Sequence, residues 1–215
     1  RLEDARKYQV YRQTLIDNGL KVKAIRPLEI IRKGDGQVLF AFCDIDVETP
    51  DQRHLPHTVM LRGHFVSVLT CLMDADSGER FLLLVRQRRV ANGDFFYEHP
   101  AGMVDNMTDA VAVAEKEVAE ETGLSLNRTD IKPLHDKLLY TSPGLLDEAG
   151  YLFYAELTLP RAEIDALHDK RFVSASETED ISTAIVPYAQ AHELIVHTNG
   201  LLMLHLYEQL QRQKG

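Results

Sequence analysis

The chain has few cysteines, no tryptophan and no long apolar run, and these lacks exclude whole classes of protein. Its two cysteines, Cys43 and Cys71, cannot form a disulfide framework, and both stand in apolar stretches that favour buried free thiols. The longest nearly apolar stretch, residues 65–73, is far shorter than the roughly 18 to 20 residues that cross a bilayer. We therefore expect no membrane span and, with no charged-then-apolar leader, a protein of the reducing cytoplasm.

Positive charge is also scarce, because 24 lysines and arginines face 33 aspartates and glutamates, for a net charge of −9. Such a chain repels the phosphate backbone of nucleic acids, so we expect no nucleic-acid partner. The imbalance is uneven, since residues 1–60 hold 10 basic and 9 acidic side chains. The acidity therefore belongs to the later part of the chain.

Hydrophobic periodicity predicts alternating strands and helices, which indicates an α/β protein without internal repeats. A leading helix over residues 2–20 precedes a hairpin with strands at 28–31 and 38–42. A polar connection over 48–57 places a boundary near residue 58, so we expect domains 1–58 and 59–215. The second domain should hold a helix over 108–122, two helices over 189–211 divided at Asn199-Gly200, and strands near 59–61, 65–73, 81–85, 95–97, 138–140 and 151–157.

The most informative segment spans residues 102–124. Glu117, Glu120 and Glu121 stand at i, i+3 and i+4, so they share one helical face, where their like charges repel one another. Gly102 allows a close backbone turn before the helix, and Gly123 suits the left-handed residue that ends one. Two interpretations stay open: the face is solvated, like most acidic helix ends, or it binds Mg²⁺ or Mn²⁺, which prefer oxygen ligands.

The same segment resembles the signature of the Nudix hydrolases, G-x5-E-x7-R-E-U-x-E-E-x-G-U, where U is a bulky apolar residue. Gly102 and the run from Glu117 to Leu124 fit the family spacing without a gap. Two positions differ, since Thr108 stands in place of a glutamate and Lys116 in place of an arginine. Thr108 is a good N-cap but removes a carboxylate, and Lys116 keeps the charge but loses the planar bidentate grip of arginine.

Matches before this signature resemble the branch of the family that acts on nucleoside diphosphate sugars. The run from Glu98 to Gly102 resembles its Glu-x-Pro-Ala-Gly lead-in, and the strand that ends at Arg89 resembles its Gln-x-Arg element. The resemblance implies that Arg89 and Glu98 bind substrate. It implies a metal site formed by the Ala101 carbonyl and the carboxylates of Glu117, Glu120 and Glu121.

A later acidic segment supplies candidates for the general base. The segment around Glu177 and Glu179 resembles the loop from which some members of the branch provide a catalytic glutamate. Glu120, which belongs to the helical signature, is the alternative. The resemblance also implies an α/β/α sandwich around a mixed sheet, preceded by an N-terminal β-subdomain through which such enzymes form homodimers.

The resemblance implies hydrolysis of the diphosphate bond in a nucleoside diphosphate sugar of the ADP-ribose, ADP-sugar or UDP-sugar type. Bound Mg²⁺ or Mn²⁺ would neutralise the diphosphate and lower the pKa of a bound water. The products would be a nucleoside monophosphate and a sugar 1-phosphate. The altered Thr108 and Lys116 leave an alternative of another class, a non-catalytic domain that binds or senses nucleotide sugars.

Overall fold

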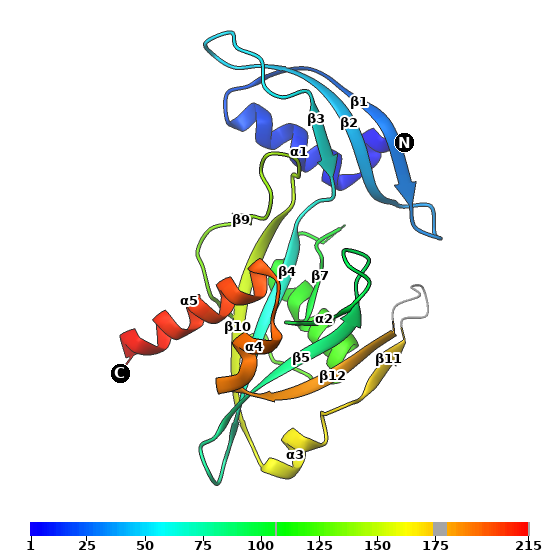
Figure 1. Ribbon diagram of the computed structural model, residues 1–215. Coiled ribbons are helices and arrows are strands. Elements are labelled where there is room, and N and C mark those ends of the chain that lie inside the picture. The colour runs from blue at the N-terminus through cyan, green and yellow to red at the C-terminus, as the bar shows by residue number, and fades with distance from the viewer. Residues whose placement is uncertain (106, 174–179, 215) are drawn as a thin grey trace. The chain divides into compact units, whose positions relative to one another are not determined.

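The computed structural model describes residues 1–105, 107–173 and 180–214 (Figure 1). The chain forms two compact units, each built from segments that are distant in the sequence. The first unit comprises Arg1–Phe65, Met103–Thr108 and Leu139–Gly150. The second unit comprises Val66–Gly102, Asp109–Leu138 and Tyr151–Gly215.

The first unit contains an antiparallel sheet with the strand order β1-β2-β3, formed by Lys21–Arg32, Val38–Glu48 and Thr58–Leu61. In β2 every second residue from Ala41 to Val47 is buried, as expected of a sheet with one covered face. Two helices precede the sheet, η1 (Leu2–Asp4) and α1 (Arg6–Asp17), and Leu2 is buried in the core of this unit. The predicted leading helix and hairpin are confirmed.

The second sheet has nine strands within the described residues. Its strand order is β11-β12-β5-β4-β10-β8, with β6 paired to β5, β7 to β4 and β9 to β10. The strands are β4 (Phe65–Asp74), β5 (Arg80–Arg88), β6 (Phe95–Glu98), β7 (Ala101–Met103), β8 (Lys132–Pro133), β9 (Leu139–Tyr140), β10 (Ala149–Leu159), β11 (Arg171–Val173) and β12 (Asp180–Pro187).

Helices cover this sheet. Residues 82–85 of β5 are all buried, in contrast to the alternation in β2, because both faces of β5 are covered. Figure 1 shows α2 (Ala110–Thr122) behind the sheet and α5 (Thr198–Lys214) in front of it. The shorter helices are α3 (Arg161–Asp165), η2 (Tyr188–Gln190) and α4 (Ala191–Leu194). This arrangement confirms the predicted α/β class.

The break predicted at Asn199-Gly200 is wrong. The chain leaves the helical conformation after Leu194, and α5 begins at Thr198, so both residues lie inside its first turn. Gly200 is buried, and a Cβ at this position would lie 2.6 Å from atoms of both Ile195 and His197. The glycine therefore serves close packing here, and the helix continues through it.

Both cysteines are buried free thiols, as the sequence predicts. Burial raises the pKa of the Cys43 thiol to about 11, so the reactive thiolate is scarce at neutral pH. None of the helices in the described residues is both long enough and apolar enough to cross a membrane.

Candidate functional site

Helix α2 carries the predicted glutamates, and specific residues fix both of its ends. The Asp109 carboxylate accepts hydrogen bonds from the backbone amides of Val111 and Ala112 at 3.1 and 3.2 Å. Asp109 is therefore the N-cap, and the prediction that Thr108 caps the helix is wrong by one residue. At the other end Gly123 has φ +73° and donates to the Ala119 carbonyl, which confirms the predicted left-handed terminus.

A second interaction holds the N-cap in place. Arg128 pairs with Asp109 at 2.7 Å from the segment that follows the helix. The hydrogen bond from Arg128 and those from the backbone amides lower the pKa of Asp109, so it stays ionised at neutral pH. An anionic N-cap also interacts favourably with the positive end of the helix dipole.

The apolar face of α2 determines how the helix is rotated. Four of its residues are buried, and they recur at the spacing of a helical stripe: Val113, Ala114, Val118 and Thr122. Burial of this stripe leaves the glutamate face on the flank of the helix. Glu117 and Glu121 stand one turn apart on that face, and both contact strand β7.

Glu117 lies against the backbone of Gly102. A Cβ at Gly102 would lie 2.5 Å from Oε1 of Glu117 and closer still to its Cδ, so the carboxylate occupies space that any other residue would fill. The side chain of Glu117 is only 18% exposed. Gly102 is therefore required because a carboxylate approaches the backbone, which the sequence pattern alone does not reveal.

Glu121 is anchored to the neighbouring residue of the same strand. Its Oε2 accepts a hydrogen bond from the backbone amide of Ala101 at 3.1 Å. Two carboxylates of one helical face thus meet the two consecutive residues Ala101 and Gly102 of β7. A short backbone segment and two acidic side chains together offer a group of hard oxygen atoms.

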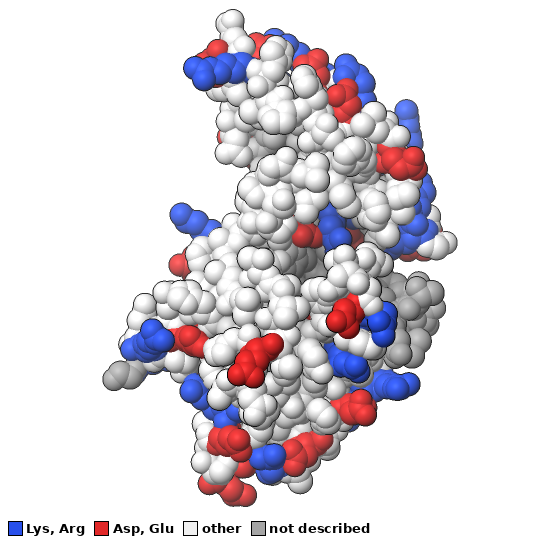
Figure 2. Space-filling model, viewed as in Figure 1, with Lys and Arg blue, Asp and Glu red and all other residues white. Residues whose placement is uncertain are grey.

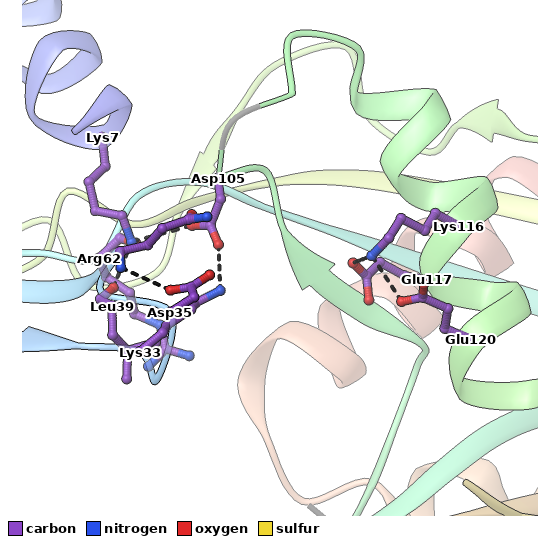
Figure 3. A network of polar contacts seen from close by, with 10 residues as sticks. Lys7, Lys33, Asp35, Leu39, Arg62, Asp105, Lys116, Glu117 and Glu120 are labelled. Carbon is purple, nitrogen blue, oxygen red and sulfur yellow. Dashed lines mark hydrogen bonds and ion pairs between the residues drawn. The ribbon is translucent and has the colours of Figure 1, made fainter. Parts of the chain in front are cut away.

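Glu120 differs from the other two glutamates because it points toward solvent and is 60% exposed. Lys116 Nζ lies 2.9 Å from Oε2 of Glu120 and 3.4 Å from Oε1 of Glu117 (Figure 3). The hydrogen bond to Glu120, followed by the charges of both glutamates, raises the pKa of Lys116. One lysine therefore offsets part of the repulsion between the carboxylates.

The described residues hold no group of three or more His, Cys, Asp or Glu side chains arranged to bind a metal ion. Glu117 and Glu121 nevertheless provide two carboxylates beside the β7 backbone. Together with the Ala101 carbonyl they are oxygen donors of the type that Mg²⁺ and Mn²⁺ prefer. The residues present fit a hard divalent cation in their chemistry.

The predicted substrate residues Arg89 and Glu98 form an ion pair, with Nε of Arg89 2.8 Å from Oε2 of Glu98. Arg89 directly follows β5 and Glu98 ends β6. The register places Glu98 opposite Val85 and Arg88 opposite Phe95, so the two side chains meet by reaching along the strand pair. The side chain of Glu98 is 16% exposed and that of Arg89 is 38% exposed. Glu98 thus orients Arg89.

Two histidines near this ion pair carry no signal in the sequence. His99 is completely buried, and burial lowers its pKa to about 3, so it is neutral and structural at physiological pH. Burial also lowers the pKa of His197, and the charge of Glu98 offsets only part of that effect.

The predicted catalytic residues Glu177 and Glu179 lie outside the described residues.

Comparison with known proteins assigns the family. A model of the NUDIX domain matches residues 63–202. The chain belongs to the NUDIX family. The glutamate helix α2 and strand β7 both lie inside the matched range.

Several characterised proteins are similar to this Nudix protein. Nudix hydrolase 14, chloroplastic, of Arabidopsis thaliana is 31% identical over 202 residues, covering 90% of this chain and 64% of that protein. GDP-mannose pyrophosphatase of an Enterobacter species is 36% identical over 143 residues, covering 62% and 65%. ADP-ribose pyrophosphatase of Bacillus subtilis is 28% identical over 188 residues, covering 83% and 91%. The chain thus spans slightly less than two thirds of the first two relatives.

The fold is also similar to a solved structure described as an ADP compounds hydrolase. The TM-score is 0.64 at 17% sequence identity, and the match covers 91% of this chain and 96% of that one. A likeness at this identity supports the fold, and the residues of the box support the family.

Proposed function

We propose that this Nudix protein is a metal-dependent hydrolase of the diphosphate bond in nucleoside diphosphate sugars. The products are a nucleoside monophosphate and a sugar phosphate, which is a 1-phosphate from an ADP-, UDP- or GDP-hexose and the 5-phosphate of ribose from ADP-ribose. The placement of Glu117 against Gly102 and of Glu121 on the Ala101 amide carries the proposal, because it puts two carboxylates beside one strand. The names of the pyrophosphatase relatives support a substrate of the ADP-ribose or GDP-mannose type, and an ADP-sugar or UDP-sugar is a further candidate from the resemblance in sequence.

In this proposal Glu117, Glu121 and the Ala101 carbonyl would hold Mg²⁺ or Mn²⁺, and the more exposed Glu120 would contribute from the helix face. Bound divalent cations neutralise a diphosphate and lower the pKa of a coordinated water. The Ala101 amide keeps the Glu121 carboxylate oriented, and Gly102 leaves space for Glu117 because it has no side chain. Both residues therefore act by fixing oxygen donors before substrate arrives.

The remaining chemistry belongs to residues around this centre. Arg89 binds the diphosphate with its charged fork, after Glu98 has oriented it. Glu177 or Glu179 accepts the proton of the attacking water, with Glu120 as the alternative base. Thr108, which stands where the family signature has a glutamate, is compatible with this proposal. Asp109 caps the helix in any case, and Glu117 and Glu121 beside β7 are both present.

We also propose that the protein is a homodimer of the reducing cytoplasm, with residues 1–58 as the dimerisation subdomain and residues 59–215 as the hydrolase domain. Two buried free thiols support a reducing compartment. Apolar side chains exposed on the β1–β2 hairpin, among them Leu28 and Phe42, support an interface there.

The test is hydrolysis of ADP-ribose, ADP-glucose, UDP-glucose and GDP-mannose with Mg²⁺, with Mn²⁺ and with a chelator. We expect turnover of at least one substrate that disappears in the chelator. Glu121→Gln should reduce kcat by orders of magnitude, because the amide keeps the size of the side chain but not its charge. Its melting temperature should stay the same or rise, since one of several repelling carboxylates is neutralised.

Glu115→Gln is the matched control, since it makes the same chemical change on the same helix away from the glutamate face. It should keep near-normal activity. A Glu121→Gln protein that keeps most of its turnover would refute the metal assignment. Binding of these nucleotide sugars without turnover of any of them would favour a sensor instead.

A further inference from the structure

The first unit contains a pocket of about 210 Å³ that the proposed reaction does not use. It lies at the start of α1 and the tip of the β1–β2 hairpin, and the main polar residues that line it are Arg6, Lys7, Arg32, Gln37 and Asp105. We call it the basic pocket. Figure 2 shows several Lys and Arg side chains, with acidic side chains between them, where this unit carries the N-terminus and the hairpin tip.

Two lysines share a single carboxylate in this region. Lys7 Nζ lies 3.4 Å from Oδ1 of Asp105, and Lys33 Nζ lies 2.7 Å from its Oδ2 (Figure 3). The Lys7 side chain is only 7% exposed and also donates to the carbonyls of Leu39 and Arg62. Burial lowers the pKa of Lys7, and the nearby Lys33 charge acts in the same direction. Two ammonium groups therefore share the Asp105 carboxylate beside the pocket.

Arg6 and Arg32 also line the pocket. Arg32 donates to the Gly36 carbonyl at 2.9 Å, and neither Arg32 nor the half-buried Arg6 has a carboxylate partner among the described residues. One further acid, Asp4, lines the pocket and is 75% exposed. Among the described residues, the pocket therefore presents two guanidinium groups without a carboxylate in direct contact, although Asp4 and Asp105 also line it.

Helix α1 adds hydrogen-bond donors at the same place. It begins behind Ala5, and in the described part of the chain no side chain caps it and no acid stands in its first turn. The first amide groups of a helix lack internal partners and favour an anion. The first turn of α1, Arg6, Arg32 and the buried Lys7 thus lie at one cavity, and all four features are complementary to a compact negative charge.

We propose that the basic pocket binds a small anion of the phosphate class, either free or as the head group of a phosphorylated small molecule. Tetrahedral phosphate oxygens accept the charge-assisted bonds that arginine forks provide. The volume is below the roughly 300–1,000 Å³ of pockets that enclose drug-sized ligands, so a compact anion fits better than a whole nucleotide sugar. The inference does not depend on the proposed hydrolysis.

The test is calorimetric titration of the full chain with inorganic phosphate in a chelator at constant ionic strength, which excludes binding through a divalent metal. We expect saturable binding that Arg6→Gln and Arg32→Gln each weaken about tenfold, because each removes a charge-assisted hydrogen bond. Arg26→Gln removes the same charge from β1 at an exposed ion pair with Asp44 and should leave the affinity unchanged. Melting curves establish that every variant is folded.

Further arms identify the source of the anion and the place of binding. Glycerol phosphate in parallel with inorganic phosphate separates a monoester head group from the free ion, and tighter binding of either supports the proposal. Glu121→Gln should bind phosphate like the parent protein. Equal weakening by Arg26→Gln would reveal an unspecific charge effect, and loss in Glu121→Gln would place the anion at the glutamate helix. Either result, or no saturable binding up to about 10 mM, would overturn the proposal.

Discussion

Replacement of Gly102 by alanine tests the arrangement of the Nudix box most directly. The new Cβ would lie 2.5 Å from Oε1 of Glu117, whereas nonbonded heavy atoms are normally about 3.5–4.0 Å apart. The carboxylate must therefore move by at least about 1 Å to restore normal contact, and its Cδ, which lies closer still, by more. The backbone of Gly102 does not have a positive φ, so the side chain of Glu117 is the source of the conflict.

The consequences for stability and for activity should differ. A displaced side chain costs about 0.5–1.5 kcal/mol if it leaves its preferred rotamer, so the melting temperature should fall by only a few degrees. A misplacement of about 1 Å in a catalytic group can reduce the rate by about 100-fold. We therefore expect Gly102→Ala to lose about two orders of magnitude in kcat and to need more Mg²⁺ for half-maximal activity.

The assay is a magnesium titration of steady-state hydrolysis beside thermal melting. Gly34→Ala is the control, because no atom lies within 4 Å of a Cβ at that position and its φ is not positive. This variant should keep both stability and activity. If Gly102→Ala also retains parental activity and magnesium dependence, the packing of Glu117 against β7 does not matter for the reaction, and the reasoning is refuted.

Three further variants test other parts of the structure. Asp109→Ala should lower the melting temperature by several degrees, because it removes the N-cap of α2. The pKa of Asp109 is lowered in the folded protein, so the difference in melting temperature between variant and parent should have its full size above about pH 4. That difference should disappear as the pH falls through the folded pKa. Arg89→Gln should raise KM about tenfold in steady-state assays, whereas Arg161→Gln on α3 should not. Gly200→Ala should destabilise the protein by about 1–3 kcal/mol in denaturant titrations, because the added Cβ meets Ile195 at 2.6 Å; a stabilising effect, as alanine has in open helices, would contradict this packing.

Local patterns predict α2 well. Its apolar stripe, the shared face of Glu117, Glu120 and Glu121, and the left-handed Gly123 all follow from helical periodicity and from the conformational freedom of glycine. The N-cap was misplaced by one residue because Thr108 and Asp109 are both good caps, and local preference does not separate them. The pairing of Asp109 with Arg128, 19 residues away, favours the second.

Local patterns fail where distant packing decides. Asn199-Gly200 is a typical helix stop in sequence, yet Gly200 lies inside α5 because its missing side chain admits Ile195 and His197. The spacing of the glutamates also gives no reason for Glu117 to be 18% exposed and Glu120 60% exposed. That difference arises from the rotation of α2 about its buried stripe.

The sequence by itself determines the glutamate helix, the charge of each part of the chain and the family, because these depend on spacings within a few helical turns. Only the tertiary structure brings Glu117 and Glu121 to β7, and only it joins Lys33 to Asp105 across 72 residues. Such contacts depend on how the chain returns through its sheets. The local spacing of residues does not indicate which distant backbone segment lies beside a given carboxylate in the folded protein.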